Sequence, residues 1–151
     1  MSNFCGAHRV PRANEPIDSP RAALAVVSLA VRRPLGHQTI ALVLDQDRRG
    51  RSIVVVEGTT DPDAPLAIVE QVAASIADAG ETGGLVLATV RPGGGPLPGD
   101  DERWLEASDL ADDLGVELVE WFVIGAETPT VAANAWCPRD LLGELPRWDT
   151  W

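Results

Sequence analysis

The sequence lacks several residue types that support particular functions. It has no tyrosine, all 12 of its basic residues are arginine, and its 151 residues include only two cysteines and two histidines. Cys5 and Cys137 lie far apart, which excludes a disulfide-rich secreted scaffold, so we expect reduced thiols in the cytoplasm. The histidines, His8 and His37, are also far apart, and no local cluster of histidines stands out.

Long hydrophobic runs are absent as well. The longest apolar stretch, Ala22–Val31, is interrupted by Ser28, and a membrane-spanning helix needs about 20 such residues. The first 20 residues hold three prolines and no apolar core segment, so we expect no secretory signal.

Acidic residues outnumber basic ones, and the charge is unevenly spread. The net charge is −11, with +4 over residues 1–56 and −15 over residues 57–151. A strongly acidic body repels phosphate backbones, so extensive nucleic-acid binding is not expected.

Hydrophobic periodicity and turn residues predict a single α/β domain with one mixed β-sheet flanked by helices. We expect helices over 20–31, 66–79 and 100–114, and strands over 37–44, 52–56, 84–90, 116–124 and 128–132. The domain is assigned to residues 18–136, with an N-terminal arm at 1–17 and a C-terminal tail at 137–151.

The middle of the chain combines a strand, a loop rich in glycine and proline, and an acidic helix start. Strand 84–90 leads into Arg91-Pro-Gly-Gly-Gly-Pro-Leu-Pro-Gly99, and Asp100-Asp-Glu102 begins the next helix. This segment resembles the RadC-like branch of the JAB/MPN (JAMM) metallopeptidases. In that family His-x-His at a strand end is followed after seven residues by Ser and after two more by Asp.

The surrounding elements resemble the same family. Leu42-Val-Leu-Asp45 followed by Arg48 is similar to its hairpin, Gly58-Thr59 to its Arg-Gly-Thr stretch, and 114–125 to its strand ending in Ile-Val-Gly. The resemblance covers about residues 19–133. It implies a JAB/MPN-like fold, with the layering of cytidine deaminases.

The residues of the family's zinc site are replaced in this sequence. In the family register, Thr89 and Arg91 stand at the His positions, Gly99 stands at the Ser position, and Glu102 stands at the Asp position. Threonine is a poor zinc ligand, and the arginine cation has no lone pair to donate. We therefore expect neither metal nor cofactor. We expect Arg91 either to pair with Glu102 in place of the metal or to reach solvent or any of the local acids.

Because the family's metal ligands are missing, the resemblance implies a catalytically inactive domain that binds another protein as a scaffold or regulatory subunit. The domain could form homo- or hetero-oligomers. Asp109, Asp112 and Asp113 belong to an acidic run that is either a solvated helix face or a docking surface for a basic partner. Trp148 and Trp151 either fold over the domain or anchor a partner.

Two alternatives remain open at the level of sequence. The first is an enzyme with non-zinc chemistry, in which Glu102, Asp100 or Asp101 acts as acid or base and Arg91 binds an anionic substrate. A cavity with a buried carboxylate at the end of strand 84–90 would favour it. The second is a DNA-repair-associated accessory protein, which the family implies and the negative charge opposes.

Overall fold

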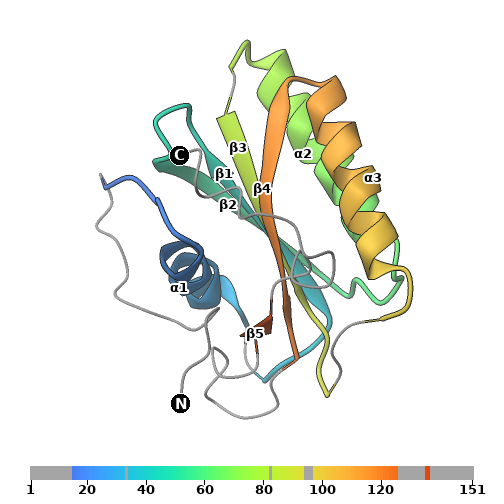
Figure 1. Cartoon of the computed structure of the whole chain (residues 1–151). Coiled ribbons are helices and arrows are strands. Elements are labelled where there is room, and N and C mark those ends of the chain that lie inside the picture. The colour runs from blue at the N-terminus through green and yellow to red at the C-terminus, as the bar shows by residue number, and fades with distance from the viewer. Residues whose placement is uncertain (1–14, 33, 82, 94–96, 126–134, 137–151) are drawn as a thin grey trace.

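The secondary structure follows the predicted order of helices and strands (Figure 1). The computed structural model describes residues 15–32, 34–81, 83–93, 97–125 and 135–136. The elements are α1 (Pro20–Ala30), β1 (Gln38–Leu44), β2 (Gly50–Glu57), α2 (Ala64–Asp78), β3 (Gly83–Val90), α3 (Asp100–Asp113), β4 (Val116–Ile124) and β5 (Ala135–Trp136). The predicted α/β class is confirmed. The strand expected over 128–132 lies outside the described residues, as do most of the arm and the tail.

The strands form one mixed sheet in the order β2-β1-β3-β4-β5. β1 is antiparallel to both β2 and β3, whereas β3 and β4 are parallel and are joined by α3. Parallel strands need such a crossover connection, because a tight turn would place the next strand antiparallel to the one before it. The carboxyl ends of β3 and β4 therefore lie at the same end of the sheet as the start of β1.

Helices cover both faces of the sheet, with α1 on one face and α2 and α3 on the other (Figure 1). Side chains alternate along each strand, so Ile40 and Leu42 of β1 pack toward α1, and Ala41 between them packs toward α2 and α3. Seven of the eight residues of β3 are buried. Burial on both faces explains its continuous apolar sequence.

Local sequence signals set the ends of two elements. Ser19 caps α1, because its Oγ accepts a hydrogen bond from the Ala22 backbone N–H at 3.1 Å. Pro20 suits the first helical position, because it has no backbone N–H that would be left without an acceptor there. At the start of β3, a Cβ on Gly83 would lie 2.2 Å from the Leu44 carbonyl oxygen. Only glycine allows this approach between β1 and β3.

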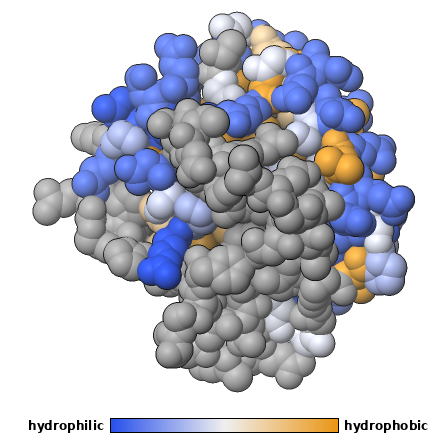
Figure 2. All heavy atoms as spheres, in the orientation of Figure 1, coloured by the Kyte–Doolittle hydropathy of each residue, from blue (hydrophilic) through white to orange (hydrophobic). Residues whose placement is uncertain are grey.

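The surface on the side of α2 and α3 is mostly hydrophilic (Figure 2). The outer face of α3 exposes Glu102, Glu106, Asp109, Asp112 and Asp113. None of the described helices has both the length and the apolar composition needed to cross a membrane.

Candidate functional site

The end of β3 and the loop that follows it form a polar site beneath the first turn of α3. Thr89 and Arg91 lie two residues apart, and both line a cavity of about 160 Å³. Threonines 59 and 60 and the carboxylate of Asp61 contribute further polar groups to the wall. The topology thus brings both strand-end positions singled out from the sequence into one cavity.

Arg91, which lines the cavity, also forms a buried ion pair with Asp100. The guanidinium of Arg91 donates from Nη1 to Oδ2 of Asp100 at 2.7 Å and from Nη2 to Oδ1 at 3.0 Å. The two side chains are 8% and 0% exposed. A bidentate arginine–carboxylate pair is among the strongest and most directional polar contacts in proteins, so it joins the end of β3 firmly to α3.

Asp100 accepts two further hydrogen bonds. The backbone N–H of Leu97 donates to Oδ2 at 2.8 Å, and Nη1 of Arg103 donates to Oδ1 at 3.1 Å. Nε of Arg103 also donates to Asp63 at 2.8 Å, and Asp63 is the residue that immediately precedes α2. Two arginines and two aspartates therefore form a charge-balanced network that joins β3, α3 and α2.

The network sets the ionisation of Asp100. Burial alone raises the pKa of this carboxyl, because a charge is poorly solvated inside a protein. The hydrogen bonds and the positive charge of Arg91, with the Leu97 N–H and Arg103, outweigh that effect and hold the pKa below its usual value. Asp100 is therefore a stable anion and a weak base.

Thr89 is held by a second buried contact. Its Oγ1 accepts a hydrogen bond from Nε1 of Trp121 on β4 at 2.9 Å, and both residues are buried. Nearby, the hydroxyls of Thr39 and Thr59 are 2.9 Å apart. Two separate hydrogen bonds thus join β3 to β4 and β1 to the loop after β2 at this end of the sheet.

The predicted pairing of Arg91 with Glu102 is wrong: the partner is Asp100, and Glu102 is exposed. Helical residues two apart point about 200° away from each other, so only one of these acids faces the sheet. The buried positions of α3 are Asp100, Trp104, Ala107, Ser108 and Ala111. This helical spacing was visible in the sequence and would have selected Asp100.

The other predicted positions have separate locations. Gly99 precedes α3 with φ of 89°, a left-handed conformation suited to glycine. Asp109, Asp112 and Asp113 lie on the solvent-facing side of α3, away from the buried pair. Trp148 and Trp151 lie outside the described residues.

The acidic run is not entirely a surface feature. Asp100 and Glu120 are buried, whereas the other acids of α3 are exposed or partly exposed. Within the described ranges, no three side chains of His, Cys, Asp or Glu come together in a group that could hold a metal ion.

Comparison with known proteins adds no assignment. The sequence matches no protein-family model, and no curated protein sequence is significantly similar to it. The features of this chain that bear on its function are therefore those of its own geometry around Arg91 and Asp100.

Proposed function

We propose that this chain is a degenerate, catalytically inactive domain of the RadC-like JAB/MPN type that works in the cytoplasm by binding another protein. The bidentate pair between Arg91 and Asp100 carries the proposal, because in the register of the resemblance Arg91 stands at a histidine position of the family and here binds a carboxylate. Glu102, at the family's Asp position, is exposed. The order of helix, hairpin, helix, strand, helix and strand also agrees with the resemblance.

The side chains at the two former histidine positions are poor zinc ligands here. The guanidinium of Arg91 has no lone pair and repels a cation. The Thr89 hydroxyl already accepts the Trp121 indole N–H. A metal here would have to displace the guanidinium from Asp100 and would gain that carboxylate and one weak hydroxyl ligand, fewer than the three protein ligands of a catalytic zinc site, so the arrangement favours the ion pair over zinc.

Acid–base chemistry with Asp100 is also disfavoured. The cavity and the buried carboxylate are the two features that would favour an enzyme at this end of β3. A general base needs a pKa near the working pH, but the pKa of Asp100 is lowered, and its two oxygens accept four hydrogen bonds. The carboxylate thus supports structure better than catalysis.

The wild-type protein is expected to bind no zinc, whereas Thr89→His/Arg91→His is expected to bind one equivalent. The double substitution removes the competing cation and puts imidazoles at two positions that line the cavity. With the Asp100 carboxylate that Arg91 no longer holds, they supply three ligands of the kind zinc prefers. Zinc bound by a folded site raises the melting temperature. Metal analysis and thermal melting with and without zinc provide the readouts.

The control is Arg91→His alone, which removes the cation but supplies a single imidazole. It should gain much less zinc affinity than the double variant. Stoichiometric zinc in the wild type would contradict the proposed inactivity. A folded double variant whose melting temperature does not respond to zinc would contradict the resemblance at this loop.

The exposed acids of α3 are expected to contact the partner. Asp109→Asn/Asp112→Asn/Asp113→Asn should reduce recovery of the protein that co-purifies with the full-length chain from its native host. Charge complementarity speeds association and is screened by salt, so moderate salt should reproduce the loss. Quantitative mass spectrometry of the captured proteins measures both effects.

The matched control neutralises three exposed acids elsewhere, in Asp18→Asn/Asp47→Asn/Asp78→Asn. Equal losses from the two triple variants would show a general charge effect and contradict docking on α3. A chain that lacks residues 147–151 tests Trp148 and Trp151 in the same assay.

A further inference from the structure

The outer edge of the sheet at β2 is open to solvent. β2 is the first strand in the sheet order and pairs with β1 on its inner side. In the part of the chain that the structure describes, the nearest pairing on its outer side is a single bridge between Pro16 and Arg49, before the strand begins. Ile53, Val54 and Val56 are 41%, 39% and 36% exposed.

The sequence of β2 does not protect this edge. Five residues, Ser-Ile-Val-Val-Val, separate Arg51 from Glu57, with no charge and no proline among them. Edge strands of monomeric proteins usually carry charges, prolines or bulges that block pairing with another chain. The register irregularity in the β1–β2 ladder lies beyond this segment, at Val43/Leu44. The segment from Ser52 to Val56 is therefore suited to adding a strand.

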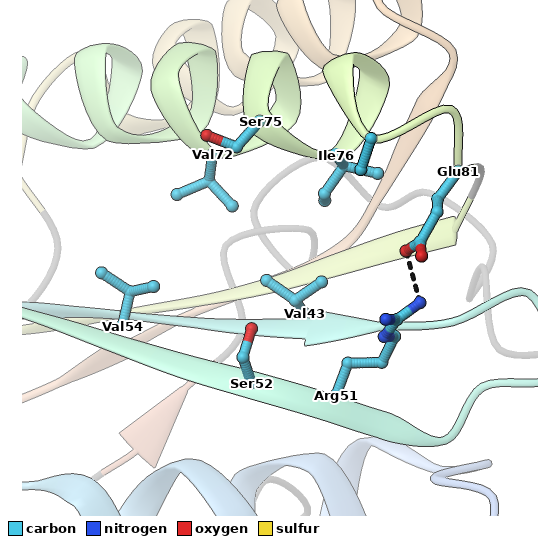
Figure 3. A pocket seen from close by; sticks show the side chains of 9 residues that line it. Val43, Arg51, Ser52, Val54, Val72, Ser75, Ile76 and Glu81 are labelled. Atoms are coloured by element: carbon cyan, nitrogen blue, oxygen red, sulfur yellow. Dashed lines mark hydrogen bonds and ion pairs between the residues drawn. The ribbon is translucent and has the colours of Figure 1, made fainter.

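A groove lined by both apolar and polar residues runs along the same edge, between β2 and α2. It has a volume of about 320 Å³, and Figure 3 shows valines 43, 54 and 72 directed into it with Ile76. The ion pair between Arg51 and Glu81 lies at one end of the groove. The open edge and the groove form one continuous surface, because Val54 belongs to both.

We infer that β2 pairs with β2 of a second copy of this chain, antiparallel, about a two-fold axis at Val54. This register opposes Val54 to its own copy, Ile53 to Val55, and Ser52 to Val56. It also brings Arg51 of each copy beside Glu57 of the other. An antiparallel pair with this symmetry keeps each face of the sheet on the same side, so the two five-stranded sheets become continuous.

The charge pattern and shape of β2 indicate that the strand that pairs with its outer edge is β2 of a second copy. The strand has a positive residue near its start and a negative residue at its end, so antiparallel self-pairing sets opposite charges together at both ends and apolar residues between them. The two grooves then adjoin across the axis, where Val54 meets its own copy and Ser52 and Val56 oppose each other on either side of it. Within one chain, Arg51 pairs with Glu81 and Glu57 pairs with Arg32. Both ion pairs are exposed and therefore weak, so pairs between the two copies can replace them.

This inference concerns the edge opposite to α3 and does not depend on the absence of zinc. The full-length protein should sediment as a dimer that dissociates on dilution, measured over an about hundredfold range of concentration. Val54→Lys places two lysines at the axis and should leave only monomer. Leu105→Lys makes the same change at a residue on α3 that is 48% exposed, and it should leave the dimer unchanged.

Charge reversal tests the register. Arg51→Glu gives each copy two acids at the paired ends, and Glu57→Arg gives each copy two arginines, so each variant alone should be monomeric. Mixed in equal amounts, they should form a heterodimer, because every glutamate then faces an arginine. A wild-type chain that stays monomeric at the highest concentration, or a dimer that survives Val54→Lys, would overturn the inference.

Hydrogen exchange of the wild type gives an independent test without substitution. The backbone amides of β2 that point away from β1 should become more protected as concentration rises, while those of α3 should not change. Concentration-dependent protection confined to another element would place the interface elsewhere and would also overturn the inference.

Discussion

Arg91→Met is expected to lower the free energy of unfolding by about 3–5 kcal/mol, the usual loss when one partner of a buried ion pair is removed. The Asp100 side chain is fully buried, so its carboxylate would lose two charge-assisted hydrogen bonds and stay out of reach of water. Arg103 would still donate to it, which sets the loss toward the lower part of that range. Urea denaturation of the purified variant measures the change.

Asp100→Asn and the double variant Arg91→Met/Asp100→Asn complete a thermodynamic cycle. The amide oxygen keeps an acceptor for the Leu97 N–H, and the double variant buries no unpaired charge. We expect the double variant to be more stable than the sum of the single losses predicts, by about 1–3 kcal/mol. Additive losses would show that Arg91 and Asp100 contribute separately.

Acid provides a further readout of the same pair. Because the pKa of Asp100 is lower in the folded protein than in the unfolded chain, the unfolded chain binds the proton first as pH falls. The contribution of Asp100 to stability is therefore complete above its unfolded pKa of about 4 and is lost as pH falls through the folded value. Asp100→Asn should have a flatter stability curve over that interval.

Trp121→Ala is expected to cost about 3–5 kcal/mol of unfolding free energy, the range for large aromatic side chains removed from a core. Trp121 is 1% exposed and belongs to the core beneath α2 and α3. Its removal opens a cavity and also takes the indole donor from the buried hydroxyl of Thr89.

Trp121→Phe separates these two effects. It keeps most of the ring packing and removes the N–H, so its loss should be about 1–3 kcal/mol, the cost of an unsatisfied buried polar group. Leu105→Ala, on the exposed side of α3, should change stability by no more than about 0.5 kcal/mol. A Trp121→Phe variant as stable as the wild type would show that the hydrogen bond contributes nothing.

The sequence predicted the elements from α1 to β4 because their signals are local, whereas β5 at Ala135–Trp136 was not predicted. α1 begins at a serine followed by proline, and the burial on both faces of β3 gives a continuous apolar run. The acids of α3 were harder to interpret, because a motif register selected Glu102 whereas helical phase selects Asp100. The helical periodicity determines which acid is buried, because only one side of α3 faces the sheet and Asp100 lies on that side.

Contacts between distant segments were not predictable in the same way. Thr89 and Trp121 are 32 residues apart, and their meeting depends on β3 and β4 being parallel neighbours in a particular register. The open edge of β2 likewise follows from the strand order, in which β1 pairs with both β2 and β3. A hairpin pattern alone leaves open which of its two strands lies at the edge.

The pairing of Arg91 with Asp100 also constrains how this protein can evolve. Each residue is costly to change while the other remains, so a lineage that loses one of them passes through a destabilised intermediate before a second substitution restores the balance. With such reciprocal dependence, a substitution at one position is expected to be followed by a substitution at the other. The loop after β3 is therefore free to vary in length and composition only where it leaves this pair in place.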